Sequence, residues 1–230
     1  GDVYKRQHHD SLRGLVVRCE AASQIVAIIG AGPAGLMAAE VLSAAGHTVH
    51  VYDAMPSVGR KFLLAGIGGL NLTHAEPFEQ FVTRYGAQTE LCESWLKTFD
   101  ANAIRQWAQG LGIDTFVGTS QRVFPTDMKA APLLRAWLHR LRHPTNGTPV
   151  VFHMRHRWQG TLNTTHTNTT AEKHPTYTLH FDTPHGPITT QAQAVVLALG
   201  GGSWSRLGSD GAWVPWLTSH GVDIAPLRPA

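Results

Sequence analysis

Residues 25–53 read IVAIIGAGPAGLMAAEVLSAAGHTVHVYD, and this stretch decides the fold. It opens with the continuous apolar run Ile25 to Ile29, which is typical of a central parallel strand buried on both faces. Pro33 then stands at the first turn of a run of helix formers that Gly46 ends. A second β-branched run, Thr48 to Tyr52, follows. The stretch therefore predicts a βαβ unit of about the ~30 residues that this motif needs.

A membrane span is the competing interpretation, because residues 25–46 carry little charge. It would place glycines and a proline in the middle of the span and Glu40 in lipid, whereas a strand, a turn and a helix account for every residue. We therefore expect no membrane association.

The turn between the predicted strand and helix, residues 30–35, has the pattern GxGxxG. Gly30 permits a tight turn, Gly32 lets the backbone approach a pyrophosphate, and Gly35 lets the helix lie close to the strand. The N-terminus of such a helix offers unpaired N–H groups and a partial positive charge to phosphates. The pattern predicts a dinucleotide site.

Asp53 strengthens this prediction, because it follows Gly30 by 23 positions and ends the second strand. A carboxylate at that point can accept hydrogen bonds from both ribose hydroxyls of an adenosine. It would also repel a 2′-phosphate, which disfavours NADP at this site. FAD and NAD remain.

The choice between them rests on the glycine-rich segment GRKFLLAGIGGLNLT, residues 59–73, which we expect to be a loop. The cationic groups of Arg60 and Lys61 can reach a pyrophosphate, and the glycines can turn N–H groups toward an anion or a flavin edge. Such a segment favours FAD, since the chain of a simple dehydrogenase would run straight into a further βα unit. An NAD-dependent dehydrogenase is kept as the alternative.

Composition limits the number of domains, the cellular compartment and the presence of a metal site. The chain has 230 residues, of which 43% are apolar and 15% are charged, enough for one large globular domain or one plus part of a second. Cys19 and Cys92 fit no metal-ligand spacing and no disulfide framework, so we expect a cytoplasmic protein without a metal site.

The formal net charge is only +3. Several arginines do crowd residues 135–157, which raises a third hypothesis, a flavin-bound RNA-modification or RNA-binding protein. No RNA-binding motif accompanies these arginines, and we expect no nucleic-acid partner.

Elements beyond the βαβ unit are predicted from periodicity. We expect helices over residues 77–85, 94–111 and 129–141, strands over 150–158 and 222–224, and a hairpin of 177–181 with 188–199 that leads into a buried strand. Residues 163–174 are expected to form a solvated loop.

Five segments in this order carry a resemblance to a known family: GAGPAGLMAAEVLSAAGHTVHVYDA, GRKFLLAGIGGLNLT, QRVFPTDMKAAPLLRAWL, FHMRHRW and VVLALGGGSWSRLGSDGAW. Together they resemble the BaiN/YhiN-type NAD(P)/FAD-dependent oxidoreductases. The resemblance implies an α/β, Rossmann-like FAD-binding domain of the glutathione-reductase type, with a parallel sheet, helices and a β-hairpin, interrupted by an insert domain.

The resemblance also implies which residues contact FAD. These are Gly30, Ala31, Gly32, Pro33, Ala34 and Gly35 at the pyrophosphate, Asp53 at the ribose, Gly59, Arg60 and Lys61, then Asn71 and Thr73 nearer the flavin, the backbone near Trp158 at the adenine, and Gly200 and Gly201 in a second motif.

The expected organisation is an extraneous or disordered segment 1–23, the first portion of the FAD-binding domain at 24–205, and the start of an insert domain at 206–230. We thus expect an N-terminal fragment of an FAD-dependent oxidoreductase that acts on a small molecule. NAD(P)H is an open choice as external electron donor. The residues assign no substrate and no oligomeric state. They assign no catalytic group either, which is expected of a flavoenzyme because the cofactor carries the electron transfer.

Overall fold

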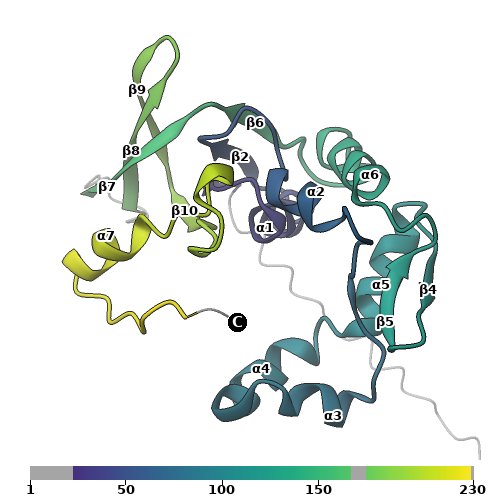
Figure 1. Cartoon of the computed structure of the whole chain (residues 1–230). Helices are drawn as coiled ribbons and strands as arrows, with labels where there is room; N and C mark the ends of the chain where they lie inside the picture. Colours follow the sequence, from purple (N-terminus) through teal and green to yellow (C-terminus); the bar gives the residue numbers. More distant parts are fainter. Residues whose placement is uncertain (1–22, 167–174, 229–230) are drawn as a thin grey trace, which may run out of the picture.

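The computed structural model describes residues 23–166 and 175–228, so the prediction for residues 1–23 falls almost wholly outside it. A parallel sheet lies at the centre (Figure 1). Its strands are β1 (Ile25–Ile29), β2 (Thr48–Asp53), β6 (Val151–Met154) and β10 (Ala194–Leu197), in the order β10-β1-β2-β6. The predicted α/β fold is confirmed.

Side chains of β1 alternate between two hydrophobic clusters, as the two-residue period of a strand requires. Val26 and Ile28 pack with the helices α1 (Pro33–Ala44), α5 (Ala101–Gly110) and α6 (Ala130–Arg142). Ala27 and Ile29 pack against an antiparallel sheet on the opposite face. The central sheet is thus covered on both faces.

The covering sheet consists of β7 (Arg157–His166), β8 (Pro175–Thr183) and β9 (Gly186–Ala192). The predicted hairpin is confirmed, and the strand after it, β10, is present but only partly buried. The single strand predicted at 150–158 is wrong, because the chain passes from β6 to β7 and so changes sheets. At that point Arg155 has a φ of 61° and donates its N–H to the carbonyl of Met55, which turns the chain.

The segment predicted to be a loop at 59–73 contains α2 (Arg60–Ala65), so that prediction is wrong in part. The sequence RKFLLA consists of good helix formers, and Gly59 begins the helix with a φ of 67°. The segment ends in β3 (Thr73–His74), which joins β5 (Arg122–Pro125) and β4 (Thr115–Val117) in a small antiparallel sheet that the sequence did not predict.

One helix predicted over 94–111 is instead two, α4 (Thr89–Leu96) and α5. Asp100 causes the break, because its backbone is extended and its carboxylate accepts the N–H of Ala103 at 2.7 Å, as an N-cap does. The helix predicted at 77–85 is α3 (Phe78–Thr83), and a 3₁₀ turn, η1 (Gly86–Gln88), connects it to α4.

After β10 the chain forms a 3₁₀ turn, η2 (Ser205–Leu207), and a short helix, α7 (Trp213–Ser219). Residues 222–224 form no strand, contrary to the prediction. The loop predicted at 163–174 is also corrected, since β7 continues to His166, while residues 167–174 lie outside the described part. Within residues 23–166 and 175–228, no helix is long and apolar enough to cross a membrane.

A charged network fastens the helices of the first face to one another. The carboxylate of Glu40 on α1 accepts the indole N–H of Trp137 at 2.6 Å and of Trp107 at 3.2 Å, and it pairs with Arg140 at 2.6 Å. Removing one partner of such a group leaves a partly buried charge unpaired, which is strongly destabilising. Helices α1, α5 and α6 are therefore held together beneath the sheet.

Candidate dinucleotide-binding site

Two glycines of the 30–35 turn are required by the protein's own packing. A Cβ on Gly30 would lie 2.2 Å from the carbonyl oxygen of Ala198, and Gly30 has a φ of 111°. A Cβ on Gly35 would lie 1.9 Å from the carbonyl oxygen of Gly30. These glycines let β1, α1 and the end of β10 approach one another closely.

Gly32 differs from both, because a Cβ there would meet no protein atom within 4 Å. Its φ of −81° suits any residue, so neither packing nor backbone conformation requires glycine. Free space over the backbone at the start of a helix is what a pyrophosphate needs in order to approach. Gly32 therefore fits the role of a cradle for a diphosphate.

The N-terminus of α1, next to Gly32, is uncapped. Among the residues that the structure describes, no side chain caps α1, and none accepts a hydrogen bond from the N–H of Ala34 or Gly35. Leu36 donates the first helical bond, to the carbonyl of Gly32. The free donors and the positive end of the helix dipole together suit an anion.

Asp53 lies at the end of β2, where backbone donors fix its carboxylate. Its Oδ2 accepts the N–H of Ala31 at 2.7 Å, and its Oδ1 accepts the N–H of Met55 at 2.7 Å. Each oxygen of an ionised carboxylate can accept a second hydrogen bond. Asp53 is thus oriented by the protein and still able to accept ribose hydroxyls.

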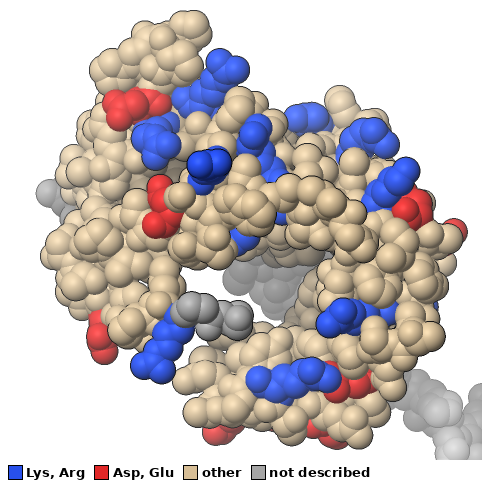
Figure 2. Space-filling view, viewed as in Figure 1, with Lys and Arg blue, Asp and Glu red and all other residues tan. Residues whose placement is uncertain are grey.

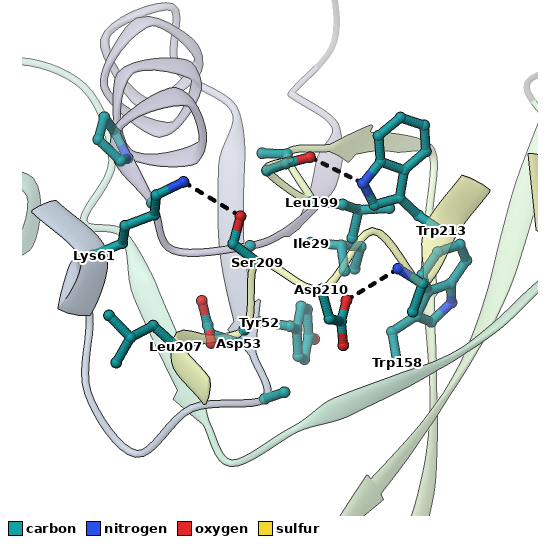
Figure 3. A pocket seen from close by; sticks show the side chains of 18 of the residues that line it. Ile29, Tyr52, Asp53, Lys61, Trp158, Leu199, Leu207, Ser209, Asp210 and Trp213 are labelled. Atoms are coloured by element: carbon teal, nitrogen blue, oxygen red, sulfur yellow. Dashed lines mark hydrogen bonds between the residues drawn. The ribbon is translucent and has the colours of Figure 1, made fainter. Parts of the chain in front are cut away.

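These groups share one cleft of about 810 Å³, a volume within the ~300 to 1,000 Å³ of ordinary ligand sites. Figure 3 shows its labelled side chains, with Lys61 toward one side, Asp53 and Ser209 next, then Tyr52 and Asp210, and Trp158 and Trp213 at the opposite side. Of the residues predicted to contact the cofactor, the following line this cleft: Gly30, Gly32, Pro33, Asp53, Lys61, Asn71, Trp158 and Gly200.

Lys61 supplies a positive charge at the end of the cleft opposite Trp158 and Trp213. Its Nζ donates to the hydroxyl of Ser203 at 2.5 Å and lies 3.4 Å from the hydroxyl of Ser209. Ser209 in turn donates to the carbonyl of Gly201 at 2.8 Å. The 200–209 segment therefore holds the ammonium of Lys61 on the side of the cleft where the helix N-terminus lies.

The other predicted site residues do not line the cleft: Ala31, Ala34, Gly35, Gly59, Arg60, Thr73 and Gly201. Several of them act within the protein instead. The N–H of Gly59 donates to the carbonyl of Ala31, and Thr73 pairs with Val123 in the small antiparallel sheet. Arg60 is turned toward Ser57, whose hydroxyl lies 3.4 Å from its Nη1.

The sequence reasoning missed most of the far end of the cleft, which His156, Asp210, Trp213 and Trp216 line with Trp158. No local motif marks these residues, and they come from two segments that are more than 50 positions apart. Their only signal was the resemblance, whose quoted segments contain His156, Asp210 and Trp213.

Stacked aromatic rings lie behind Tyr52, which itself lines the cleft. Tyr52 lies between His153 and Phe181, with ring centroids 4.4 Å apart on each side, and Nδ1 of His50 is 2.9 Å from Nε2 of His153. Burial lowers the pKa of His50. Burial, and then the neighbouring His50 and His156, lower the pKa of His153 to about 4. The imidazole of His153 is therefore neutral at physiological pH.

Figure 2 shows Lys and Arg distributed over the viewed face among neutral and acidic residues. Two arginines of the crowded 135–157 region have internal partners. Arg140 pairs with Glu40, and the guanidinium of Arg142 lies 5.2 Å from the ring centroid of Phe152. These contacts weaken the hypothesis of an RNA-binding patch.

Comparisons with known proteins agree with the geometry. A short match of 47 residues, 55% identical, relates the chain to the glutamate synthase [NADPH] small chain of Azospirillum brasilense, covering 20% of this chain and 10% of that protein. The structure of a flavocytochrome c3 fumarate reductase in its open conformation superposes with a TM-score of 0.55 and 20% identity, over 79% of this chain and 34% of that one.

THI4 of Thermovibrio ammonificans gives a TM-score of 0.48 at 14% identity, over 87% of this chain and 64% of that one. The chain thus spans only part of each protein that it resembles. Residues 24–228 match the family described as the HI0933-like protein Rossmann domain, which confirms the resemblance found in the sequence. The chain belongs to the HI0933-like Rossmann domain family.

Proposed function

We propose that this chain binds FAD and is the cofactor-binding part of an FAD-dependent oxidoreductase that acts on a small molecule. The observation that carries the proposal is the joint placement of an uncapped α1 N-terminus, a Gly32 that packing does not require, and the fixed carboxylate of Asp53 in one cleft. These are the three groups that a diphosphate linked to a ribose would use.

Asp53 favours a coenzyme whose adenosine ribose carries no 2′-phosphate. The carboxylate of Asp53, oriented by two backbone N–H groups, can accept hydroxyl hydrogens, whereas a 2′-phosphate would place two like charges side by side. FAD and NAD satisfy this condition and NADP does not.

FAD is favoured over NAD by the α2 segment. Lys61, Phe62 and Ala65 of α2, with Leu70 to Leu72 after it, line the cleft. A second βα unit of a simple dehydrogenase would not place this helix and the segment that leads into β3 there. The family resemblance and the flavocytochrome fold neighbour support the same choice. An NAD-dependent dehydrogenase is the alternative.

The bound flavin would supply the electron transfer, and the chain would bind and orient it. Gly32, the α1 N-terminus and Lys61 would hold the diphosphate, Asp53 the ribose, and Asn71 the side nearer the flavin. NAD(P)H is the external electron donor that we propose for the flavin. A cytoplasmic location belongs to the same proposal.

Absorbance tests the proposal directly. The purified chain, loaded with FAD and desalted, should retain a yellow cofactor that absorbs near ~450 nm. Competition with NAD should leave it bound. Gly32→Val is the matched control, because the new side chain enters free space and blocks only the ligand. Retention of NAD with no retention of FAD would favour the dehydrogenase, and retention of neither would refute the proposal.

A further inference from the structure

The end of the cleft away from Lys61 is built from indole rings. Trp158 donates its N–H to the carbonyl of Thr161 at 3.2 Å, and Trp213 donates its N–H to the carbonyl of Gly200 at 2.9 Å. The rings of Trp158 and Trp216 meet edge to face, with centroids 4.7 Å apart. The polar atoms of Trp158 and Trp213 are thus used within the protein, and their rings remain as an apolar lining.

Asp210 stands among these rings as a carboxylate. Its Oδ1 accepts the N–H of Ala212 at 3.1 Å, which fixes the side chain. No ion pair found among residues 23–166 and 175–228 involves it. In Figure 3 Asp210 lies between Tyr52 and Trp158 within the cleft. An ionised carboxylate only accepts hydrogen bonds, so a ligand at this end should present an N–H or O–H group.

A backbone hydrogen bond links the indole end of the cleft to Asp53, which is the proposed contact of the ribose. The N–H of His156 donates to the carbonyl of Asp53 at 2.9 Å, so the turn that leads into Trp158 is attached directly to the backbone of Asp53. The base of a nucleotide is bonded to its ribose. With the ribose at Asp53 and the diphosphate at Gly32 and Lys61, the base would extend to the indoles and Asp210.

We infer that Asp210 selects adenine by accepting a hydrogen bond from its exocyclic amine, while the rings of Trp158 and Trp213 line the base. This assignment rests on the proposed function, because it takes the cleft to hold an adenine dinucleotide. Hypoxanthine and guanine carry a carbonyl oxygen in place of that amine, and this oxygen would face the carboxylate of Asp210 with no proton between them.

The test measures binding of ADP and of inosine diphosphate to the full chain, followed by quenching of tryptophan fluorescence and by calorimetry. A hydrogen bond to a charged group predicts that ADP binds about 10-fold more tightly than inosine diphosphate or better. Asp210→Asn should remove or reverse this preference, because an amide can donate to the carbonyl oxygen of hypoxanthine. Its Oδ1 can still accept the N–H of Ala212, so the local fold should persist.

Asp114→Asn is the matched control, because Asp114 is exposed and does not line the cleft. It should keep the preference for ADP. Equal affinity of the unmodified chain for the two diphosphates would overturn the role of Asp210 while leaving the dinucleotide site intact. An unchanged preference in Asp210→Asn would do the same. If the unmodified chain binds neither ADP nor FAD, the proposed function itself fails, and this assignment fails with it.

Discussion

The two ends of the cleft are built by different means. The end proposed to hold the phosphates uses mainly backbone, namely the 30–35 turn and the N-terminus of α1, with Lys61 as its charged side chain. The base end uses side chains, chiefly Trp158, Asp210 and Trp213, from segments far apart in the chain. If the proposed function holds, the first end would bind the diphosphate that all dinucleotides share, whereas the second end would set the choice of base.

The largest effect should come from Gly35→Val, which tests whether the phosphate end depends on close packing. The new Cβ would lie 1.9 Å from the carbonyl oxygen of Gly30, in contact with backbone that cannot move aside easily. We expect destabilisation by about 4 kcal/mol or loss of the fold. Circular dichroism during thermal unfolding measures this. A melting temperature like that of the unmodified chain would show that α1 does not need this approach.

Gly32→Val tests the complementary case. Since a Cβ at residue 32 meets nothing within 4 Å, the melting temperature should change little. Affinity for FAD should fall by about 100-fold or more, because the side chain occupies the space of the diphosphate. Fluorescence titration with FAD, beside the unfolding curve, separates the two effects. Unchanged affinity for FAD would remove Gly32 from the site.

Asp53→Ala examines the junction of the two ends. Loss of the charged hydrogen bonds to the ribose, together worth about 1.5 to 3 kcal/mol, should weaken FAD binding by roughly 10- to 150-fold. Asp53→Asn keeps one acceptor oxygen and should lose less. Calorimetric titration of both variants gives the comparison. Equal affinity in Asp53→Ala and the unmodified chain would show that the carboxylate only serves the N–H groups of Ala31 and Met55.

The smallest effect concerns pH and the base end. The folded chain lowers the pKa of His153 to about 4, so between that value and ~6.5 the unfolded chain binds more protons than the folded one. Stability should therefore fall as pH drops through this window. The loss should be on the order of 1 kcal/mol, since the ring is partly exposed to solvent.

Urea unfolding at a series of pH values measures this loss. His153→Phe keeps a ring to stack on Tyr52 and should flatten the profile, leaving the smaller contribution of His50. An equally steep profile in His153→Phe would assign the pH dependence to other groups.

The same contrast explains how much could be predicted from the sequence. The strands, turn and helix of residues 25–53 follow from local patterns, because glycine spacing, apolar runs and a terminal Asp53 act within one βαβ unit. The fold class and the cleft position of Gly30, Gly32 and Asp53 were therefore accessible.

The base end was not accessible in this way. Asp210 and Trp213 reach the cleft only because the chain returns through β10, and pairing of distant segments leaves no local pattern. The break at Arg155 was also missed, since an arginine at positive φ has no composition signal. Arg60 and Lys61 are adjacent in sequence, yet successive residues of a helix point in different directions, and only Lys61 lines the cleft.

Ala31 occupies a variable position of the glycine motif, yet both of its backbone polar groups are engaged. Its N–H donates to Asp53, its carbonyl accepts from Gly59, and its side chain is 1% exposed. Its amide should therefore exchange with deuterated water only when the whole turn opens. Slow exchange at Ala31, beside rapid exchange at Ala34 that slows when a coenzyme is added, would report occupancy of the cleft without any measurement of catalysis.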